Sequence, residues 1–199
     1  ALKEILPRLE WAHCIVIGPG LGRDPETGEL IAELLKLIKK PLIIDADGLN
    51  LIADNPDMLE NLPPGTVLTP HPGEFKRLLG NQYDQTLDRF DLLSNCALHW
   101  GATVVLKGAP TVTAFQDGTL YINSTGNPGM ATGGSGDVLT GIIAGLVAQG
   151  VSPEAAAWAG VYIHGAAGDR AAKAKGIHGM LAGDIVEHLS ETIKDLINK

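Results

Sequence analysis

One run of the sequence combines residue types that bind anions with a residue that can move a proton. Residues 133–137 read Gly-Gly-Ser-Gly-Asp and lead directly into an apolar segment with helical spacing. The start of a helix has free backbone N–H groups and a partial positive charge, and glycines let a ligand approach that backbone closely. The run therefore predicts a polyphosphate site, with Gly133, Gly134, Ser135 and Gly136 as candidate nucleotide-binding residues.

Asp137 ends this run and is the candidate catalytic residue. It falls in the first turn of the predicted helix, where an acid can simply stabilise the helix dipole. A carboxylate beside an anion site can also take the proton of a substrate hydroxyl, as a general base does in phosphoryl transfer. We favour the catalytic role, because an acid that only caps a helix does not require a run of glycine and serine directly before it. The run is neither a P-loop nor a dinucleotide fingerprint, since both spacings are missing.

Four apolar, strand-like segments alternate with helical segments ahead of this run. A β-hairpin with the turn Asp117-Gly118 follows them, and the rest of the chain is helical. The predicted strands are 13–17, 41–45, 66–69, 103–106, and the hairpin strands 111–115 and 119–123. The predicted helices are 25–39, 49–55, 73–80, 84–100, 136–149, 153–174 and 181–197. Continuously apolar strands that alternate with helices indicate an α/β domain with a parallel sheet covered on both faces, spanning residues 1–199.

The loops that follow the four strands are the second functional signal. In parallel sheets, ligands bind beyond the carboxyl ends of the strands. Each predicted strand ends in a polar or glycine-rich loop, and these loops are 18–24, 45–50, 69–74 and 107–111. Loops are often rich in Gly, Pro and Asp for structural reasons alone, but four of them at one edge favour a binding site.

The composition narrows the class of protein and ligand. The 199 residues are 45% hydrophobic and 19% charged, which excludes a disordered chain. The formal net charge is -8 and no long basic run occurs, which argues against nucleic acid or an anionic membrane as a partner. No apolar stretch is long enough to cross a bilayer, and we do not expect the first residues to be a signal peptide. Cys14 and Cys96 are expected to be reduced core thiols, so we expect a cytoplasmic protein.

Five ordered segments resemble the ADP- or ATP-dependent NAD(P)H-hydrate dehydratase family of the ribokinase-like superfamily. They are Gly18-Pro19-Gly20-Leu21-Gly22, Asp45-Ala46-Asp47-Gly48-Leu49-Asn50, Leu68-Thr69-Pro70-His71-Pro72-Gly73-Glu74-Phe75, Lys107-Gly108-Ala109-Pro110-Thr111 and residues 127–141. The resemblance implies a three-layer α/β/α fold with a mainly parallel sheet and a hairpin before the glycine-rich loop. It also implies repair of (6S)-NAD(P)H hydrate: ADP or ATP phosphorylates the 6-hydroxyl, phosphate leaves, and NAD(P)H is restored. ADP, converted to AMP, is the expected donor, and Mg²⁺ is the expected metal.

The resemblance also implies roles for single residues. Asp137 matches the family's catalytic acid, which contacts the hydrate, and Gly136 matches a glycine that contacts the nucleotide. The loop that holds the nucleotide matches Lys107, Gly108, Ala109, Pro110 and Thr111. The family's residues that contact the hydrate correspond to His71, Gly20 and Gly22.

Several residues keep two interpretations at this point. Asp45, Asp47 and Asn50 are turn and cap residues, or they hold a hydrated Mg²⁺ at the phosphates, since magnesium takes few carboxylates and several waters. Taken alone, Lys107 fits a surface lysine at a strand end as well as it fits a nucleotide-binding lysine. His164 lies in an apolar helix, where a packed core histidine is the favoured interpretation.

The match departs from the family in length. The chain starts after the family's N-terminal helices and first strands, so we expect a domain that is incomplete on that side. A complementing N-terminal segment or an epimerase domain is then an expected partner, and an exposed sheet edge favours a homo-oligomer. Two other functions stay open: a kinase of the same superfamily for a thiazole or pyrimidine alcohol, and a nucleotide-binding module without catalysis.

Overall fold

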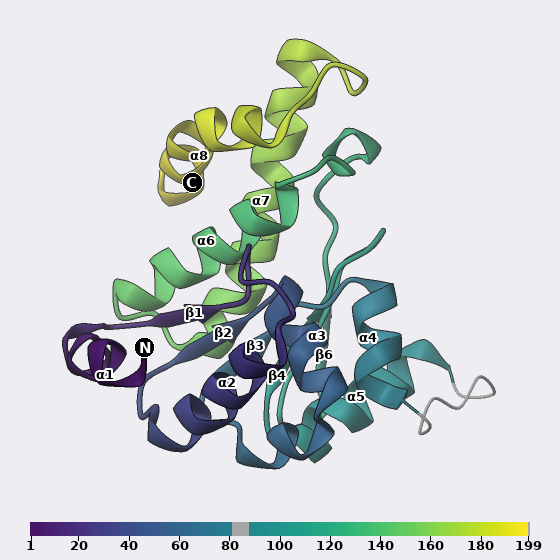
Figure 1. Ribbon diagram of the computed structural model, residues 1–199. Helices are drawn as coiled ribbons and strands as arrows, with labels where there is room; N and C mark the ends of the chain where they lie inside the picture. Colours follow the sequence, from purple (N-terminus) through teal and green to yellow (C-terminus); the bar gives the residue numbers. More distant parts are fainter. Residues whose placement is uncertain (81–87, 199) are drawn as a thin grey trace.

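Short apolar runs form the strands of one six-stranded sheet in the computed structural model (Figure 1). The structure describes residues 1–80 and 88–198. The strands lie in the order of the sequence: β1 (Ile15–Ile17), β2 (Leu42–Ile44), β3 (Thr66–Leu68), β4 (Thr103–Leu106), β5 (Val112–Ala114) and β6 (Leu120–Ile122). Strands β1 to β4 are parallel, and β5 and β6 continue the sheet as an antiparallel hairpin.

The register of the parallel strands places their carboxyl ends at one edge. Ile17 pairs with Ile44, and Ile44 pairs with Leu68. The ladder continues past the strands, because the Lys107 amide donates to the Pro70 carbonyl at 2.8 Å. The loops after β1, β2, β3 and β4 therefore begin side by side, as expected for a parallel sheet.

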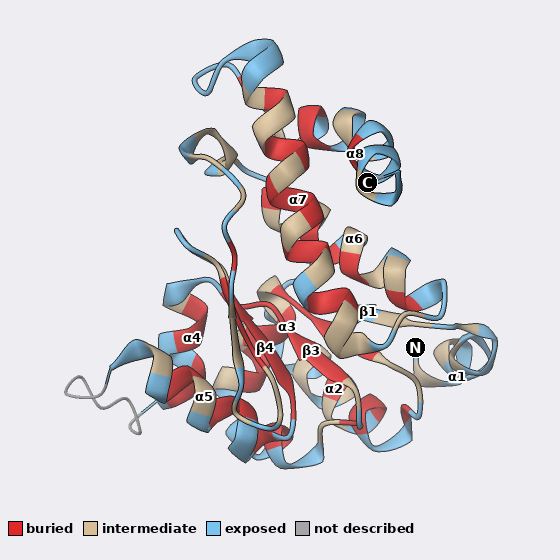
Figure 2. Ribbon diagram, turned by 180° about the vertical axis from the view of Figure 1, so that it is seen from behind, coloured by how far each residue is buried: buried red, intermediate tan, exposed pale blue. Residues whose placement is uncertain are grey.

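Helices cover both faces of the sheet because alternate strand residues point to opposite sides. Ile44, Leu68 and Val104 pack in a core with the helices α2 (Pro25–Leu37), α3 (Ala46–Asp54), α4 (Pro72–Leu79) and α5 (Arg89–Trp100). Ile43 and Val105 face the other way, onto α6 (Ser135–Ala148) and α7 (Pro153–Lys175). The predicted three-layer α/β/α architecture is confirmed, and Figure 2 shows the buried residues along these layers.

The last helix extends away from the sheet. α8 (Ala182–Ile197) lies against the C-terminal part of α7, well above the strands in Figure 1. A small separate cluster of Ala167, Ala171, Met180 and Ile185 joins the two helices. Within the described part of the chain, no helix combines the length and apolarity needed to cross a membrane.

Most predicted elements are confirmed with small shifts of their ends. The helix expected over 49–55 begins at Ala46, because the polar residues of its first turn hide the helical spacing. The helix expected over 84–100 begins at Arg89 with Asp88 as its N-cap, and residues 84–87 lie outside the described chain. Helix α1 (Leu2–Trp11) was not predicted, and it contains Pro7, a residue that usually ends a helix. The 3₁₀ helices η1 (Pro56–Asn61) and η3 (Pro128–Met130) were not predicted either.

Candidate functional site

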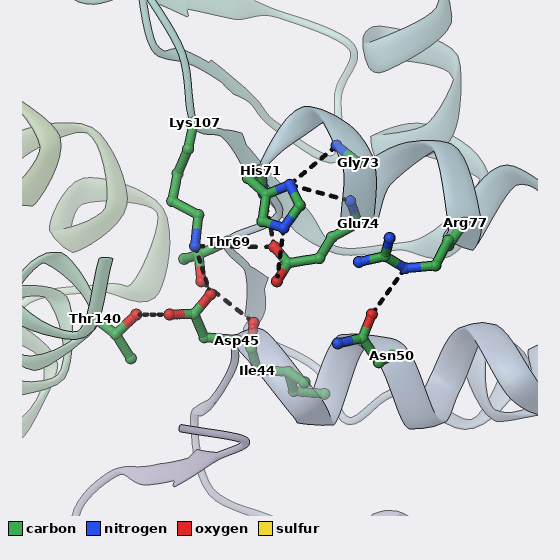
Figure 3. Close-up of polar contacts among 10 residues, drawn as sticks. All are labelled: Ile44, Asp45, Asn50, Thr69, His71, Gly73, Glu74, Arg77, Lys107 and Thr140. Carbon is green, nitrogen blue, oxygen red and sulfur yellow. Dashed lines mark hydrogen bonds and ion pairs between the residues drawn. The ribbon is translucent and has the colours of Figure 1, made fainter. Parts of the chain in front are cut away.

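A polar cluster of Asp45, Glu74, Lys107 and Thr140 lies where β2, β3 and β4 end and α6 begins (Figure 3). Asp45 follows β2 directly and is only 1% exposed. Its Oδ1 accepts a hydrogen bond from Lys107 Nζ at 2.7 Å, and its Oδ2 accepts one from Thr140 Oγ1 at 2.8 Å. One buried carboxylate therefore joins two strand ends and a helix.

Lys107 has a second acidic neighbour. Its Nζ lies 3.9 Å from Oε2 of Glu74, whose side chain is 6% exposed, whereas the Lys107 side chain is 20% exposed. Burying a carboxylate away from water is costly unless a charge and hydrogen bonds compensate for it. The ammonium is therefore fixed between two buried acids rather than extended into solvent, and Lys107 is not a surface lysine.

The glycine-rich loop meets this ammonium. A Cβ built on Gly136 would lie 3.3 Å from Lys107 Nζ. Gly134, the N-cap of α6, has a φ of 85°, a left-handed conformation that favours glycine. The sequence placed Lys107 and Gly136 in two separate nucleotide-binding segments, and the fold brings them together. An ammonium beside a helix start with bare glycine backbone is suited to an anion such as a phosphate chain.

Asp137 lies in the first turn of α6 and is exposed. No hydrogen bond or ion pair is found between its carboxylate and any other residue in the described ranges. Thr140 follows three residues later, and residues at this spacing share one face of a helix. Since Thr140 contacts Asp45, Asp137 lies on the side of the helix next to the polar cluster.

Ser135 faces inward. Its Oγ lies 3.3 Å from His164 Nε2, and both residues are buried. Burial lowers the pKa of His164 to about 4, the hydrogen bond with Ser135 opposes this shift, and the positive charge of Lys107 adds to it. His164 is therefore a neutral core histidine at neutral pH, as its apolar helix predicted. The Ser135 hydroxyl anchors the start of α6 to His164 on α7. Any contact of Ser135 with a ligand would therefore come from its backbone.

His71 is the N-cap of α4. Its Nδ1 accepts hydrogen bonds from the amides of Gly73 and Glu74, at 3.0 and 3.3 Å. The ring proton then lies on Nε2, which faces Glu74 Oε1 at 3.3 Å. Glu74 Oε2 completes a capping box by accepting from the His71 amide at 2.7 Å. The imidazole is half exposed, so a ligand would meet its open edge while its nitrogens hold the helix start.

The loop after β1 is tied to α3. The Gly22 amide donates to Asp47 Oδ2 at 2.9 Å. Gly20 and Gly22 are exposed and have φ values of 69° and 79°, so both adopt the left-handed conformation. A Cβ at Gly18 would lie 1.7 Å from the Asp45 carbonyl oxygen, so only glycine permits this close approach of the loop. The loop thus passes directly over the strand end that carries Asp45.

The structure gives the candidate metal residues other partners. Both oxygens of Asp45 accept hydrogen bonds, Asp47 holds Gly22, and Asn50 Oδ1 accepts from Arg77 Nε at 2.9 Å. Over residues 1–80 and 88–198, no group of three or more His, Cys, Asp or Glu side chains could hold a metal ion. A metal at this site would need most of its ligands from water and from a bound phosphate.

The segment after β4 forms an exposed turn. Thr111 Oγ1 donates to the Gly108 carbonyl at 3.0 Å and closes the turn, and Ala109-Pro110 is a cis peptide. Gly108, Ala109 and Pro110 are exposed beside the Lys107 side chain. This leaves their backbone open to a ligand held at the start of α6.

Three residues of the site were not singled out from the sequence. Glu74 and Thr140 complete the polar cluster. Asp169 on α7 accepts from the Gly126 amide and from Asn127 Nδ2, both at 3.0 Å, and so anchors the start of the glycine-rich loop. An acid within the Ala- and Gly-rich run of α7 was the only sequence signal for Asp169.

Comparison with known proteins identifies the family of the chain. A family model described as NAD(P)H-hydrate dehydratase matches residues 2–191. A bifunctional NAD(P)H-hydrate repair enzyme of Moorella thermoacetica is 50% identical over 197 residues, which are 98% of this chain and 37% of that protein. The chain thus spans well under half of this relative's length.

Solved structures are similar to this chain in fold. The ADP/ATP-dependent NAD(P)H-hydrate dehydratase from Bacillus subtilis, co-crystallized with ATP/Mg²⁺ and soaked with CoA, is 31% identical with a TM-score of 0.79. That alignment covers 96% of this chain and 71% of the other. A ribokinase-like superfamily protein from Enterococcus faecalis is 34% identical with a TM-score of 0.81, over 97% of this chain and 66% of the other. The fold is therefore ribokinase-like.

Proposed function

Because the chain belongs to the NAD(P)H-hydrate dehydratase family, we propose that it restores NADH or NADPH from the (6S)-hydrate by nucleotide-dependent dehydration. The observation that carries this proposal is the Lys107 ammonium beside Gly136, one residue before Asp137. It combines a fixed cation, a helix start and an available carboxylate at one place. These are the parts that transfer of a phosphoryl group to an alcohol needs.

The first step forms an oxygen–phosphorus bond. Asp137 accepts the proton of the 6-hydroxyl, and the hydroxyl oxygen attacks the terminal phosphorus of ADP or ATP. The bond from that phosphorus to the leaving AMP or ADP breaks. Lys107 and the amides of Gly133, Gly134 and Gly136 stabilise the negative charge on the transferring group, since fixed donors in a partly dry site act strongly. The exposed turn Gly108–Thr111 holds the rest of the nucleotide.

The second step is an elimination. The lone pair of the ring nitrogen expels the phosphate from C6, and loss of a proton from the neighbouring carbon restores the ring double bond. The protein needs no dedicated acid for this step, because phosphate leaves as an anion. We assign contacts with the hydrate to Gly20, Gly22 and the open edge of His71, which lie on loops at the same edge of the sheet.

Magnesium enters this proposal only together with the nucleotide. The Bacillus subtilis relative was crystallized with ATP and Mg²⁺. Among the residues that the structure describes, no group of acidic, His or Cys side chains forms a cage for a metal, and both oxygens of Asp45 accept hydrogen bonds from other residues. Magnesium binds readily through phosphate oxygens and water with few protein ligands. We therefore place no reaction step on a protein-bound metal.

A direct assay tests the function. The 199-residue chain is incubated with NADH hydrate and either ADP or ATP, and the absorbance of the reduced nicotinamide is followed. We expect recovery of NADH together with release of phosphate, and ADP is the expected donor. No recovery with either nucleotide contradicts the proposal. A phosphorylated alcohol that accumulates without reduced nicotinamide would instead indicate a kinase.

The partners belong to the same proposal. The Moorella thermoacetica relative is bifunctional and much longer than this chain. We propose that the chain acts together with a further segment or an epimerase domain, and as a homo-oligomer. Size-exclusion chromatography with light scattering of the chain alone tests the oligomer, and a monomeric mass contradicts it.

A further inference from the structure

We propose that Asp45 is a positioning residue that holds the Lys107 ammonium at the start of α6 and fixes the rotation of that helix. This inference rests on the proposed function, because it assigns a task within the same site. Asp45 itself touches neither nucleotide nor hydrate. It acts through Lys107 on one side and through Thr140 on the other.

The geometry of one carboxylate carries the proposal. Asp45 Oδ1 lies 2.7 Å from Lys107 Nζ, and Asp45 Oδ2 lies 2.8 Å from Thr140 Oγ1. The partners are 62 and 95 residues away along the chain. Figure 3 shows the carboxylate between them, with Thr140 on one side and the lysine on the other. A side chain at 1% exposure cannot replace either partner with bulk water.

The ammonium keeps hydrogen-bonding capacity for a ligand. A lysine has three N–H donors, and Asp45 takes one of them. Glu74 Oε2, at 3.9 Å, contributes charge at a distance too long for a hydrogen bond. The side facing Gly136 is bare backbone, because glycine has no Cβ there. A phosphate at the start of α6 would therefore meet donors whose position Asp45 has set.

Thr140 extends the same control to the helix. It lies four residues after Gly136 and three residues after Asp137, so it is a neighbour of each of them on the surface of α6. The hydrogen bond from Thr140 to Asp45 fixes how far this side of the helix turns toward the strand ends. The carboxylate of Asp45 thus helps to set the positions of both the Lys107 ammonium and the candidate base Asp137. A small error in such positions can reduce a rate by about 100-fold.

This role is distinct from that of a magnesium ligand. Both Asp45 oxygens already accept a hydrogen bond, and a metal ion bound to Oδ1 would be repelled by the Lys107 ammonium, which lies 2.7 Å from that oxygen. A positioning residue predicts that Asp45 loses the part of its importance that it exerts through the ammonium once the lysine is gone. A metal ligand predicts an independent loss that higher Mg²⁺ concentrations relieve.

The test combines single and double variants of the full 199-residue chain. Asp45→Asn keeps the size of the side chain, Lys107→Met removes the ammonium, and the pair Asp45→Asn/Lys107→Met removes both. For each, kcat and KM are measured with NADH hydrate and ADP, and ADP affinity is measured by isothermal titration calorimetry. We expect Asp45→Asn to lower kcat by roughly 10- to 100-fold with a smaller change in the KM for hydrate. In the Lys107→Met background, the same change should add little further loss, because the asparagine oxygen can still accept the hydrogen bond from Thr140 Oγ1.

Thr140 supplies variants that remain informative if Asp45→Asn does not fold. Thr140→Val should lower kcat, and Thr140→Ser, which keeps the hydroxyl, should restore it. The matched control is Thr113→Val, because the Thr113 hydroxyl is buried without a partner in the described structure and lies outside the polar cluster. We expect this control to keep its kcat.

Three results overturn the proposal. One is an unchanged kcat and ADP affinity in folded Asp45→Asn and Thr140→Val. The second is a pair of losses for Asp45→Asn and Lys107→Met that multiply in the double variant. The third is a loss in Asp45→Asn that added Mg²⁺ restores. If the unaltered chain dehydrates no hydrate at all, the proposed function fails. ADP affinity across the same variants still decides whether Asp45 acts through Lys107.

Discussion

A Cβ added to Gly136 would lie 3.3 Å from the Nζ atom of Lys107, so a glycine of the α6 helix start and a lysine at the end of β4 line one space. Their closeness turns two separate sequence segments into one anion site. It also makes the bare backbone at Gly136 a requirement that can be tested by adding a single methyl group.

Gly136→Ala should weaken ADP binding while leaving the fold intact. The methyl group presses on the ammonium and covers the backbone that a phosphate would approach. Because alanine favours a helix, the free energy of unfolding should not fall. We expect ADP affinity to fall about tenfold, which corresponds to one lost charge-assisted hydrogen bond. Isothermal titration calorimetry and thermal unfolding measure the two effects.

Gly141 on the same helix is the matched control. A Cβ there meets no atom within 4 Å, and the position is exposed. Gly141→Ala should raise the free energy of unfolding by roughly 0.5–1 kcal/mol and leave ADP affinity unchanged. If the two substitutions change ADP affinity equally, Gly136 does not form part of the anion site.

Asp137→Asn should slow turnover by orders of magnitude but keep nucleotide binding. The substitution removes the proton acceptor while preserving the size of the side chain at the exposed helix start. General-base groups contribute about 10²- to 10⁴-fold to a rate, so kcat should fall by that factor. Steady-state kinetics and ADP titration on the same protein separate the two functions.

Asp91→Asn provides the comparison, because Asp91 is also an exposed acid in the first turn of a helix, here α5. A loss of kcat of the same size in both variants would mean that Asp137 acts only on the helix dipole.

The layers of the fold could be predicted from the sequence because the signal is local. Strands such as Leu42–Ile44 are buried on both faces and are therefore apolar without interruption. Loops with Asp, Gly and Pro mark the strand ends clearly. Local signals fail at α1, where Pro7 interrupts the pattern, and at the polar first turn of α3.

The site could be predicted only in parts. The run Gly133–Asp137 and the segment that begins at Lys107 were both identified, but their contact depends on strand order and register. Asp45 shows the limit most clearly, since its two partners lie 62 and 95 residues away. A turn residue, a metal ligand and a buried anchor for a lysine have the same sequence signature. Only the three-dimensional pairing separates them.

His164 should make folding stability depend on pH in the acidic range. Its pKa in the folded protein is lowered to about 4 by burial, from an ordinary value of 6.5. Below pH 6.5 the unfolded chain therefore takes up a proton that the folded chain does not. This contribution to stability is complete above pH 6.5 and falls by about 1.4 kcal/mol per pH unit as the pH drops toward 4.

Urea unfolding at several pH values between 4 and 7 checks this expectation, with His164→Gln as the comparison because glutamine keeps polar atoms near Ser135. The difference in unfolding free energy between the two proteins should change with pH in the stated direction. A difference that stays constant over this range would contradict a buried neutral histidine.

Asp169 should control the order of the glycine-rich loop from outside the reacting centre. Its carboxylate holds the Gly126 amide and the Asn127 side chain, both at 3.0 Å, and so ties the loop to α7. Asp169→Ala removes both bonds and leaves the loop free to sample other positions, so ADP affinity and kcat should both fall. Asp169→Asn keeps one acceptor oxygen and should show a smaller effect.

Hydrogen–deuterium exchange distinguishes this mechanism from general destabilisation. In Asp169→Ala, faster exchange should be confined to residues 123–134, because the helices packed on the sheet keep their own hydrogen bonds. Exchange that rises across the whole chain would indicate global unfolding instead. Unchanged exchange in the loop, together with normal ADP affinity, would show that the two bonds from Asp169 are not what orders the anion site.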